Sequence, residues 1–193
     1  MTRLLFAWIA AAAISGCGTV NRYPDRWGPL DAGERTDVCP KLDGVYANVG
    51  EKPDGTPSLA LAHILSGAMG RDGTVERQSR YRYWQDLSGA KSVQLLVTNE
   101  PNLAIKVTGE GILHEWTVPK TQFECKTGAI SMFFNESGAW DNAAVLGVGS
   151  LDLYRIDDHL VLNRSGGGAG FVLFIPVVLF TSTWSRFPLV TNP

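Results

Sequence analysis

Three cysteines, Cys17, Cys39 and Cys125, are the residues of this chain with the most specific chemistry. A cysteine sulfur is a soft nucleophile that can be alkylated, oxidised to a disulfide or bound to a metal. Which of these reactions a given sulfur undergoes depends on the residues around it and on the compartment that the chain enters.

Cys17 follows a segment with the features of a secretory signal peptide. Arg3 supplies a positive charge, residues 4–14 are apolar and uncharged, and Ser15 and Gly16 are small. A charged start, a short apolar stretch and small residues at a cleavage site are typical of exported proteins. A retained membrane helix is the alternative, but such a helix needs about 20 apolar residues and this stretch is shorter.

The residues that end this segment, Ile14-Ser15-Gly16-Cys17, resemble the lipobox of bacterial lipoproteins. The resemblance implies that a diacylglycerol thioether forms on the Cys17 sulfur, that the chain is cleaved before Cys17, and that the new amine is acylated. Residue 18 is Gly, whereas Asp at that position favours retention in the inner membrane of enterobacteria. The resemblance therefore implies an anchor in the outer membrane, with the protein facing the periplasm.

The other two cysteines are expected to form a disulfide. The periplasm is oxidising, and an even number of cysteines in an exported chain usually pairs there. We therefore predict a bond between Cys39 and Cys125, which would join the start of the folded domain to its middle. Two free buried thiols or a metal site are the alternatives, although two cysteines without a nearby pair of histidines make a poor zinc site.

Glycine-rich segments invite two catalytic or cofactor-binding interpretations, and neither fits. Gly147-Val148-Gly149-Ser150 is not followed by the glycine that completes a nucleophile elbow. The run Gly166-Gly167-Gly168-Ala169-Gly170 lacks the Gly-Lys-Ser/Thr ending of a phosphate-binding loop. We predict a hairpin turn at residues 165–170.

The remaining polar candidates are isolated from one another in the sequence. His63, His114 and His159 are far apart, and His114 alternates with apolar residues, which indicates a core histidine with a hydrogen-bond partner. Asp157-Asp158 predicts a solvated turn, since calcium needs six or more oxygen ligands. The sequence therefore predicts no catalytic, cofactor-binding or metal-binding residues, and a protein that is not an enzyme.

Composition limits the partners and the fold class. The chain has 193 residues and a net charge of -2, which becomes -3 when residues 1–16 are removed. It has no clustered basic stripe, so nucleic-acid binding is not expected. Its length suits a single domain with a sizeable core, and its 21 glycines, without a long helical period, favour a β-rich fold with many turns.

Strict alternation of apolar and polar residues begins at Ser92. Leu103, Ile105 and Val107 share one face of a strand, as expected for antiparallel strands with one buried side. We predict an all-β antiparallel meander, closed or partly closed into a barrel of about eight strands. A two-sheet sandwich is the alternative, and one short helix is expected after Ser58.

Three parts follow from these patterns. Residues 1–16 form the signal peptide, residues 17–38 form the lipidated N-terminus and a flexible tether rich in Pro and Gly, and residues 39–193 form the β-rich domain. The start of the domain is similar to the opening of a group of small uncharacterised proteobacterial lipoproteins, in the pattern Cys39-Pro40-x-Leu42-x-Gly44-x-Tyr46-x-Asn48-x-Gly50. This similarity implies no activity.

The expected function is that of a lipid-anchored envelope protein that binds or scaffolds other components without catalysis. Its expected partners are the membrane, through the lipid on Cys17, and an envelope protein or a small apolar ligand. The alternative is a carrier of a lipid or other apolar molecule, held in a barrel cavity lined by Trp116, Phe171 and Phe174.

Overall fold

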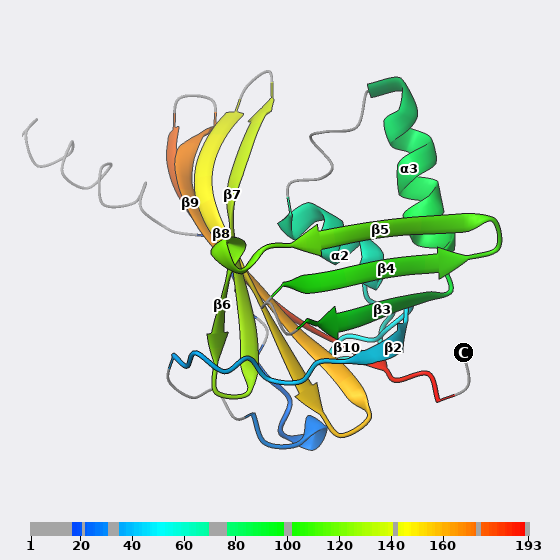
Figure 1. The fold of residues 1–193 in the computed structure, drawn as a ribbon. Coiled ribbons are helices and arrows are strands. Elements are labelled where there is room, and N and C mark those ends of the chain that lie inside the picture. Colours follow the sequence, from blue (N-terminus) through cyan, green and yellow to red (C-terminus); the bar gives the residue numbers. More distant parts are fainter. Residues whose placement is uncertain are drawn as a thin grey trace, which may run out of the picture.

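The computed structural model of the protein consists mainly of β-strands in two sheets (Figure 1). The predicted signal peptide, residues 1–16, lies outside the described residues. The structure describes residues 17–20, 22–30, 35–69, 77–98, 102–140, 143–172 and 175–191.

The larger sheet has six strands in the order β1-β10-β9-β8-β7-β6. Their bounds are β1 (Cys17–Val20), β6 (Phe123–Lys126), β7 (Ala129–Trp140), β8 (Ala143–Ile156), β9 (His159–Val172) and β10 (Ile175–Pro188). Neighbours are antiparallel, except that β1 runs parallel to β10. The predicted turn at Asp157-Asp158 joins β8 to β9, and Asp157 has the positive φ of 48° that such tight hairpins need.

The smaller sheet is an antiparallel meander in the order β2-β3-β4-β5. Its strands are β2 (Gly44–Ala47), β3 (Ser92–Val97), β4 (Leu103–Gly109) and β5 (Ile112–Val118). Ile105 lies opposite Leu95 and Trp116, and all three are buried, so the predicted alternation holds here.

In the described residues, two α-helices accompany the sheets, rather than the single helix that the sequence predicts. The expected helix is present as α2 (Leu61–Ala68), but it begins two residues later than predicted and Ser58 does not cap it. The second helix, α3 (Arg77–Gly89), was not predicted, because its charged composition hides the short inward series that includes Tyr83 and Leu87. None of the helices in the described ranges is long and apolar enough to cross a membrane.

The main core lies between the two sheets and α2. Its fully buried members include Tyr46 from β2, Leu65 from α2 and Leu153 from β8. A bridge between Tyr46 and Leu189 joins the edge of the smaller sheet to the chain just after β10, and a bridge between Glu51 and Arg186 joins the chain after β2 to β10. Among the described strands there is no closed barrel, and the two-sheet arrangement agrees with the sandwich alternative.

Asn48 connects three elements from within this core. Its side chain is fully buried, and its amide nitrogen donates to the carbonyl oxygens of Leu87 (2.7 Å) and Ala90 (3.0 Å). Its amide oxygen accepts from the backbone N–H of Ala62 at 2.9 Å. The end of β2, the start of α2 and the end of α3 are therefore held by one amide group, whose loss would leave buried polar groups without partners.

Replacement of Asn48 by Ala should lower the free energy of unfolding by about 2–4 kcal/mol, since two carbonyls and one N–H lose their buried partner. Urea unfolding monitored by circular dichroism measures this change. Asn135→Ala is the matched control, because Asn135 is exposed; its effect should stay within about 0.5 kcal/mol. Equal effects of the two substitutions would contradict the role assigned to Asn48.

Candidate functional site

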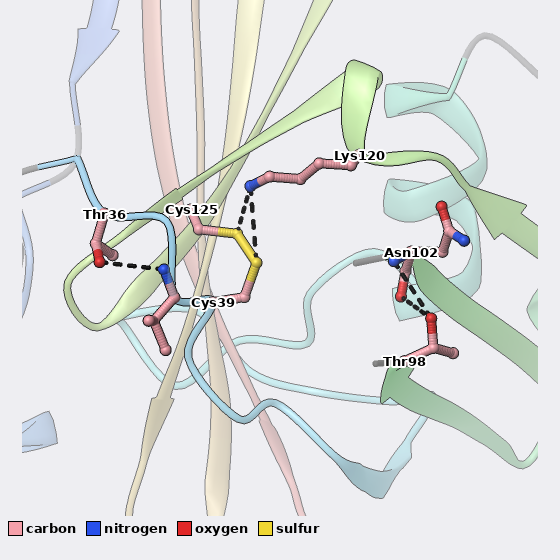
Figure 2. The surroundings of a disulfide bond; sticks show 7 residues. Thr36, Cys39, Thr98, Asn102, Lys120 and Cys125 are labelled. Carbon is pink, nitrogen blue, oxygen red and sulfur yellow. Dashed lines mark hydrogen bonds between the residues drawn. A yellow bond between two sulfur atoms is a disulfide. The ribbon is translucent and has the colours of Figure 1, made fainter. Parts of the chain in front are cut away.

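The predicted disulfide between Cys39 and Cys125 is present in the structure (Figure 2). The two Cα atoms are 4.8 Å apart, and the residues are 86 positions apart in the sequence. Lys120 lies over the bond, and its ammonium donates to the Cys125 sulfur at 2.8 Å. The bond ties the segment before β2 to β6, and this pairing excludes the alternatives of free thiols and a cysteine metal site.

The segment predicted as a flexible tether, residues 17–38, is packed against the larger sheet in its described parts. Residues 22–30, which we name the N-terminal strap, contain the short 3-10 helix η1 (Asp25–Trp27). Tyr23 packs on Trp184 with ring centroids 4.9 Å apart, and Trp27 is buried. Burial of these aromatic side chains stabilises the segment against the sheet, which Pro and Gly content alone does not reveal.

The strap covers one half of the outer face of the larger sheet. Trp184 and Tyr154 lie on this half and form a second, smaller core with Trp27. Burial raises the pKa of Tyr154 to about 12, with the nearby Asp152 carboxylate as the second cause. Burial also raises the pKa of Tyr23, although Arg186 opposes the shift. Both phenols stay protonated at neutral pH, and they pack as uncharged aromatic side chains against Trp184.

The other half of the outer face is exposed and apolar. Along the register, Val148 lies opposite Gly167, and Gly167 lies opposite Phe180, so these positions share one face of the sheet. The same alternation places four more exposed side chains there. We name this set the apolar outer face: Val20, Phe133, Leu146, Val148, Phe171 and Phe180, each 57–75% exposed.

Glycines occupy the inward positions behind this face. Gly147 and Gly149 alternate with Leu146 and Val148 in β8, and Gly166 lies opposite Gly149 in β9. The predicted hairpin turn at residues 165–170 is therefore wrong, since the glycine run lies within β9. The physical reason is space on both faces of the sheet: a Cβ at the inward Gly149 would meet the ring of Phe134, and one at the outward Gly167 would lie 3.0 Å from Phe180.

This face was missed by sequence reasoning, although a signal for it exists. In β8 the odd positions 151 and 153 are inward leucines, whereas 147 and 149 are glycines and the even positions 146 and 148 are large and apolar. Along β8, the large apolar side chains thus change from the inward to the outward face of the sheet. Glycine inside a strand often marks a position that another group approaches closely, and here the Phe134 ring lies over Gly149.

A second apolar surface is a groove of about 550 Å³ beside the end of α2. It is bounded by the end of β5, by residues 132–135 in the middle of β7, and by the 3-10 helix η3 (Lys120–Gln122) with β6. Its apolar lining includes Met69, Val118, Phe123, Met132 and Phe134, and Gln122 and Glu124 also line it. The groove is open at the surface and could hold a short apolar chain with a polar end.

The residues predicted to line an internal cavity do not come together. Trp116 is buried in the main core at 8% exposure, whereas Phe171 is 59% exposed on the apolar outer face. Phe174 lies outside the described residues. The predicted barrel cavity is therefore replaced by a core of packed side chains and by the two surface features above.

The contacts of His63 and His114 do not form a pair of a histidine base and a nucleophile that it activates. His63 Nε2 lies 3.4 Å from the Ser88 hydroxyl, but it also lies 2.8 Å from the Trp84 carbonyl oxygen, to which it must donate a proton. The same nitrogen cannot then accept a proton from Ser88. His114 lies 3.8 Å from Asp86 at the edge of the core. In the part of the chain that the structure describes, no three His, Cys, Asp or Glu side chains converge on a metal-sized site.

Comparison with known proteins does not assign the chain to a family. No family model, no curated protein and no solved structure is significantly similar to it.

Removal of the disulfide by Cys39→Ala and Cys125→Ala together should lower the free energy of unfolding by about 2–5 kcal/mol, because the unfolded chain loses a long covalent loop. Denaturant unfolding with and without a reductant measures this. The wild-type chain should lose stability on reduction, while the double variant should be insensitive to the reductant. A reductant effect of equal size in both would contradict the assignment.

Proposed function

We propose that this protein is a lipid-anchored component of a bacterial cell envelope, held in the outer membrane by lipid on Cys17 and facing the periplasm. One observation carries the proposal. Cys17 is the first residue of β1, whose register places it opposite Leu179 in β10, one residue before Gly18, which lies opposite Phe180 of the apolar outer face. The disulfide supports the same location, because disulfides persist in oxidising compartments.

The anchor on Cys17 would hold the domain close to the bilayer. Two or more acyl chains bind a membrane stably, at about 0.8 kcal/mol for each buried CH₂ group. Adjacent strands are about 4.8 Å apart, so the Cys17 backbone lies about that far from Leu179. Since β1 is hydrogen-bonded into the sheet, the acyl chains leave from the folded domain itself and a particular face of it lies near the lipid.

The role proposed for the domain is non-enzymatic binding or scaffolding of an envelope component. The groove beside α2 offers an apolar interior with polar groups at its edge, which suits recognition of a side chain or chain end. The net charge of -2 gives no attraction to nucleic acid. The proposed partners are the membrane, an envelope protein and, in the alternative below, a small apolar ligand.

Metabolic labelling with an alkyne analogue of palmitate should mark the wild-type protein and should be lost from Cys17→Ala, because the thioether and the acylated amine both depend on that cysteine. The readout is in-gel fluorescence after coupling to a dye. The chain offers a matched control in Cys39→Ala with Cys125→Ala, which should keep the label. Unchanged labelling of Cys17→Ala would refute the anchor.

A second candidate function, a carrier of a small apolar ligand, is favoured by the groove alone. Its volume of about 550 Å³ lies in the usual range of small-molecule sites, about 300–1,000 Å³. In place of the barrel cavity expected from the sequence, the ligand would lie between the end of α2 and β7. Met69 and Met132 on its walls can adapt to chains of different shape.

A dansyl-labelled fatty acid should bind the wild-type protein in a saturable manner, and Met69→Glu should weaken that binding about tenfold or more, because an acidic side chain repels the carboxylate and polarises the groove. Fluorescence titration measures the affinity. Leu113→Glu is the control, since Leu113 is 61% exposed on the smaller sheet, away from the groove lining. Absence of saturable binding by the wild-type protein would exclude the carrier function.

A further inference from the structure

We infer that the apolar outer face is a membrane-docking surface, which inserts its side chains into the interfacial region of the same bilayer that receives the Cys17 lipid. The occupant to which we commit is the phospholipid bilayer. The inference rests on the proposed function for the anchor, and it adds which face of the domain contacts lipid.

The composition of this face suits the transition from hydrocarbon to water. On its described outward positions in β7–β10, the side chains are Phe, Leu, Val, Ala, Gly, Ser and Asn, and none is charged. A row of three hydroxyls crosses these strands between the apolar outer face and the half that the strap covers; it consists of Ser150, Ser165 and Ser182. Charge begins only at the next outward position of β8, with Asp152. Apolar, hydroxyl and charged groups thus follow one another in the order that a bilayer interface requires.

Within the described ranges, no segment of the chain packs over this face. The N-terminal strap covers only the half of the sheet around Tyr154 and Trp184. Six large apolar side chains therefore remain in solvent, and contiguous exposed apolar surface of this kind marks an interaction site.

The position of β1, which begins at Cys17, favours lipid as the partner that covers this face. Phe180 lies opposite Gly18, one residue after Cys17, and Val20 at the end of β1 belongs to the apolar outer face itself. Acyl chains attached to residue 17 would therefore begin within one to three residues of these positions. The protein is then confined to the membrane surface with this patch next to it, and burial of the patch in lipid follows from the hydrophobic effect.

Cationic side chains lie at the border of the patch. The Lys126 ammonium is 6.0 Å from the centre of the Phe133 ring, and Arg22, which follows β1, is exposed. Such groups can bury their aliphatic stems and reach the phosphates of anionic headgroups. The border therefore complements the negative charge of the bilayer surface.

The test uses the full lipidated chain with one added thiol, at Val148→Cys in the patch or at Leu113→Cys in the smaller sheet. These positions are matched in exposure, at 66% and 61%. Each is labelled with the dye NBD, and the protein is reconstituted in vesicles of phosphatidylethanolamine and phosphatidylglycerol. The dye at position 148 should show a blue shift and should be quenched by lipids that carry a nitroxide, whereas the dye at position 113 should show neither.

The other possible results of this experiment lead to different conclusions. An aqueous, unquenched dye at position 148 in a membrane-bound protein overturns the docking surface. A blue shift at position 148 in dilute detergent, together with a dimer in light scattering, assigns the face to a second copy and also overturns it. The unmutated chain, labelled in parallel, has no free thiol if Cys17 is lipidated, because Cys39 and Cys125 are paired; labelling there identifies a failure of the anchor instead.

Discussion

The unequal length of the strands in the two sheets is the constraint on which this structure depends. β8, β9 and β10 have 14 residues each, about 46 Å, whereas the longest strands of the smaller sheet have seven, about 23 Å. Only half of each long strand can therefore bury side chains in the shared core. In Figure 1 the ends of β7, β8 and β9 extend beyond the smaller sheet, and it is there that glycine replaces leucine at the inward positions.

The N-terminal segment determines which surface of the long strands remains open. The disulfide holds residue 39 against β6, the strap covers Tyr154 and Trp184, and β1 extends the sheet beside β10. Together these contacts remove half of the outer face from solvent and bring Cys17 to the edge of the other half. The position of the proposed anchor and the position of the exposed apolar side chains thus have one cause, the path of this segment over the sheet.

Sequence patterns predicted the parts of the fold whose cause is local. Alternation identified β4 and β5, the turn predicted at Asp157-Asp158 lies between β8 and β9, and the expected compartment identified the disulfide. The glycine run in β9 was misinterpreted as a turn because glycine serves both tight turns and crowded sheet positions, and only the neighbouring strand distinguishes them. α3 was missed because its charged sequence carries only a short inward series, on which Tyr83 and Leu87 lie.

By itself, the sequence determined the strand periodicity, the mostly β fold class and the cysteine pairing, since each depends on residue type and short spacing or on the redox compartment. Only the tertiary structure decided that the strands form two sheets instead of a closed barrel, that the presumed tether lies against the domain, and that Leu146, Val148 and Phe180 face solvent. The physical reason is that alternation defines two faces of a strand but does not say what covers either one. What covers a face depends on segments far away in the chain. Here no described segment covers the outer face, on which large apolar residues lie, while glycines occupy inward positions of the same strands.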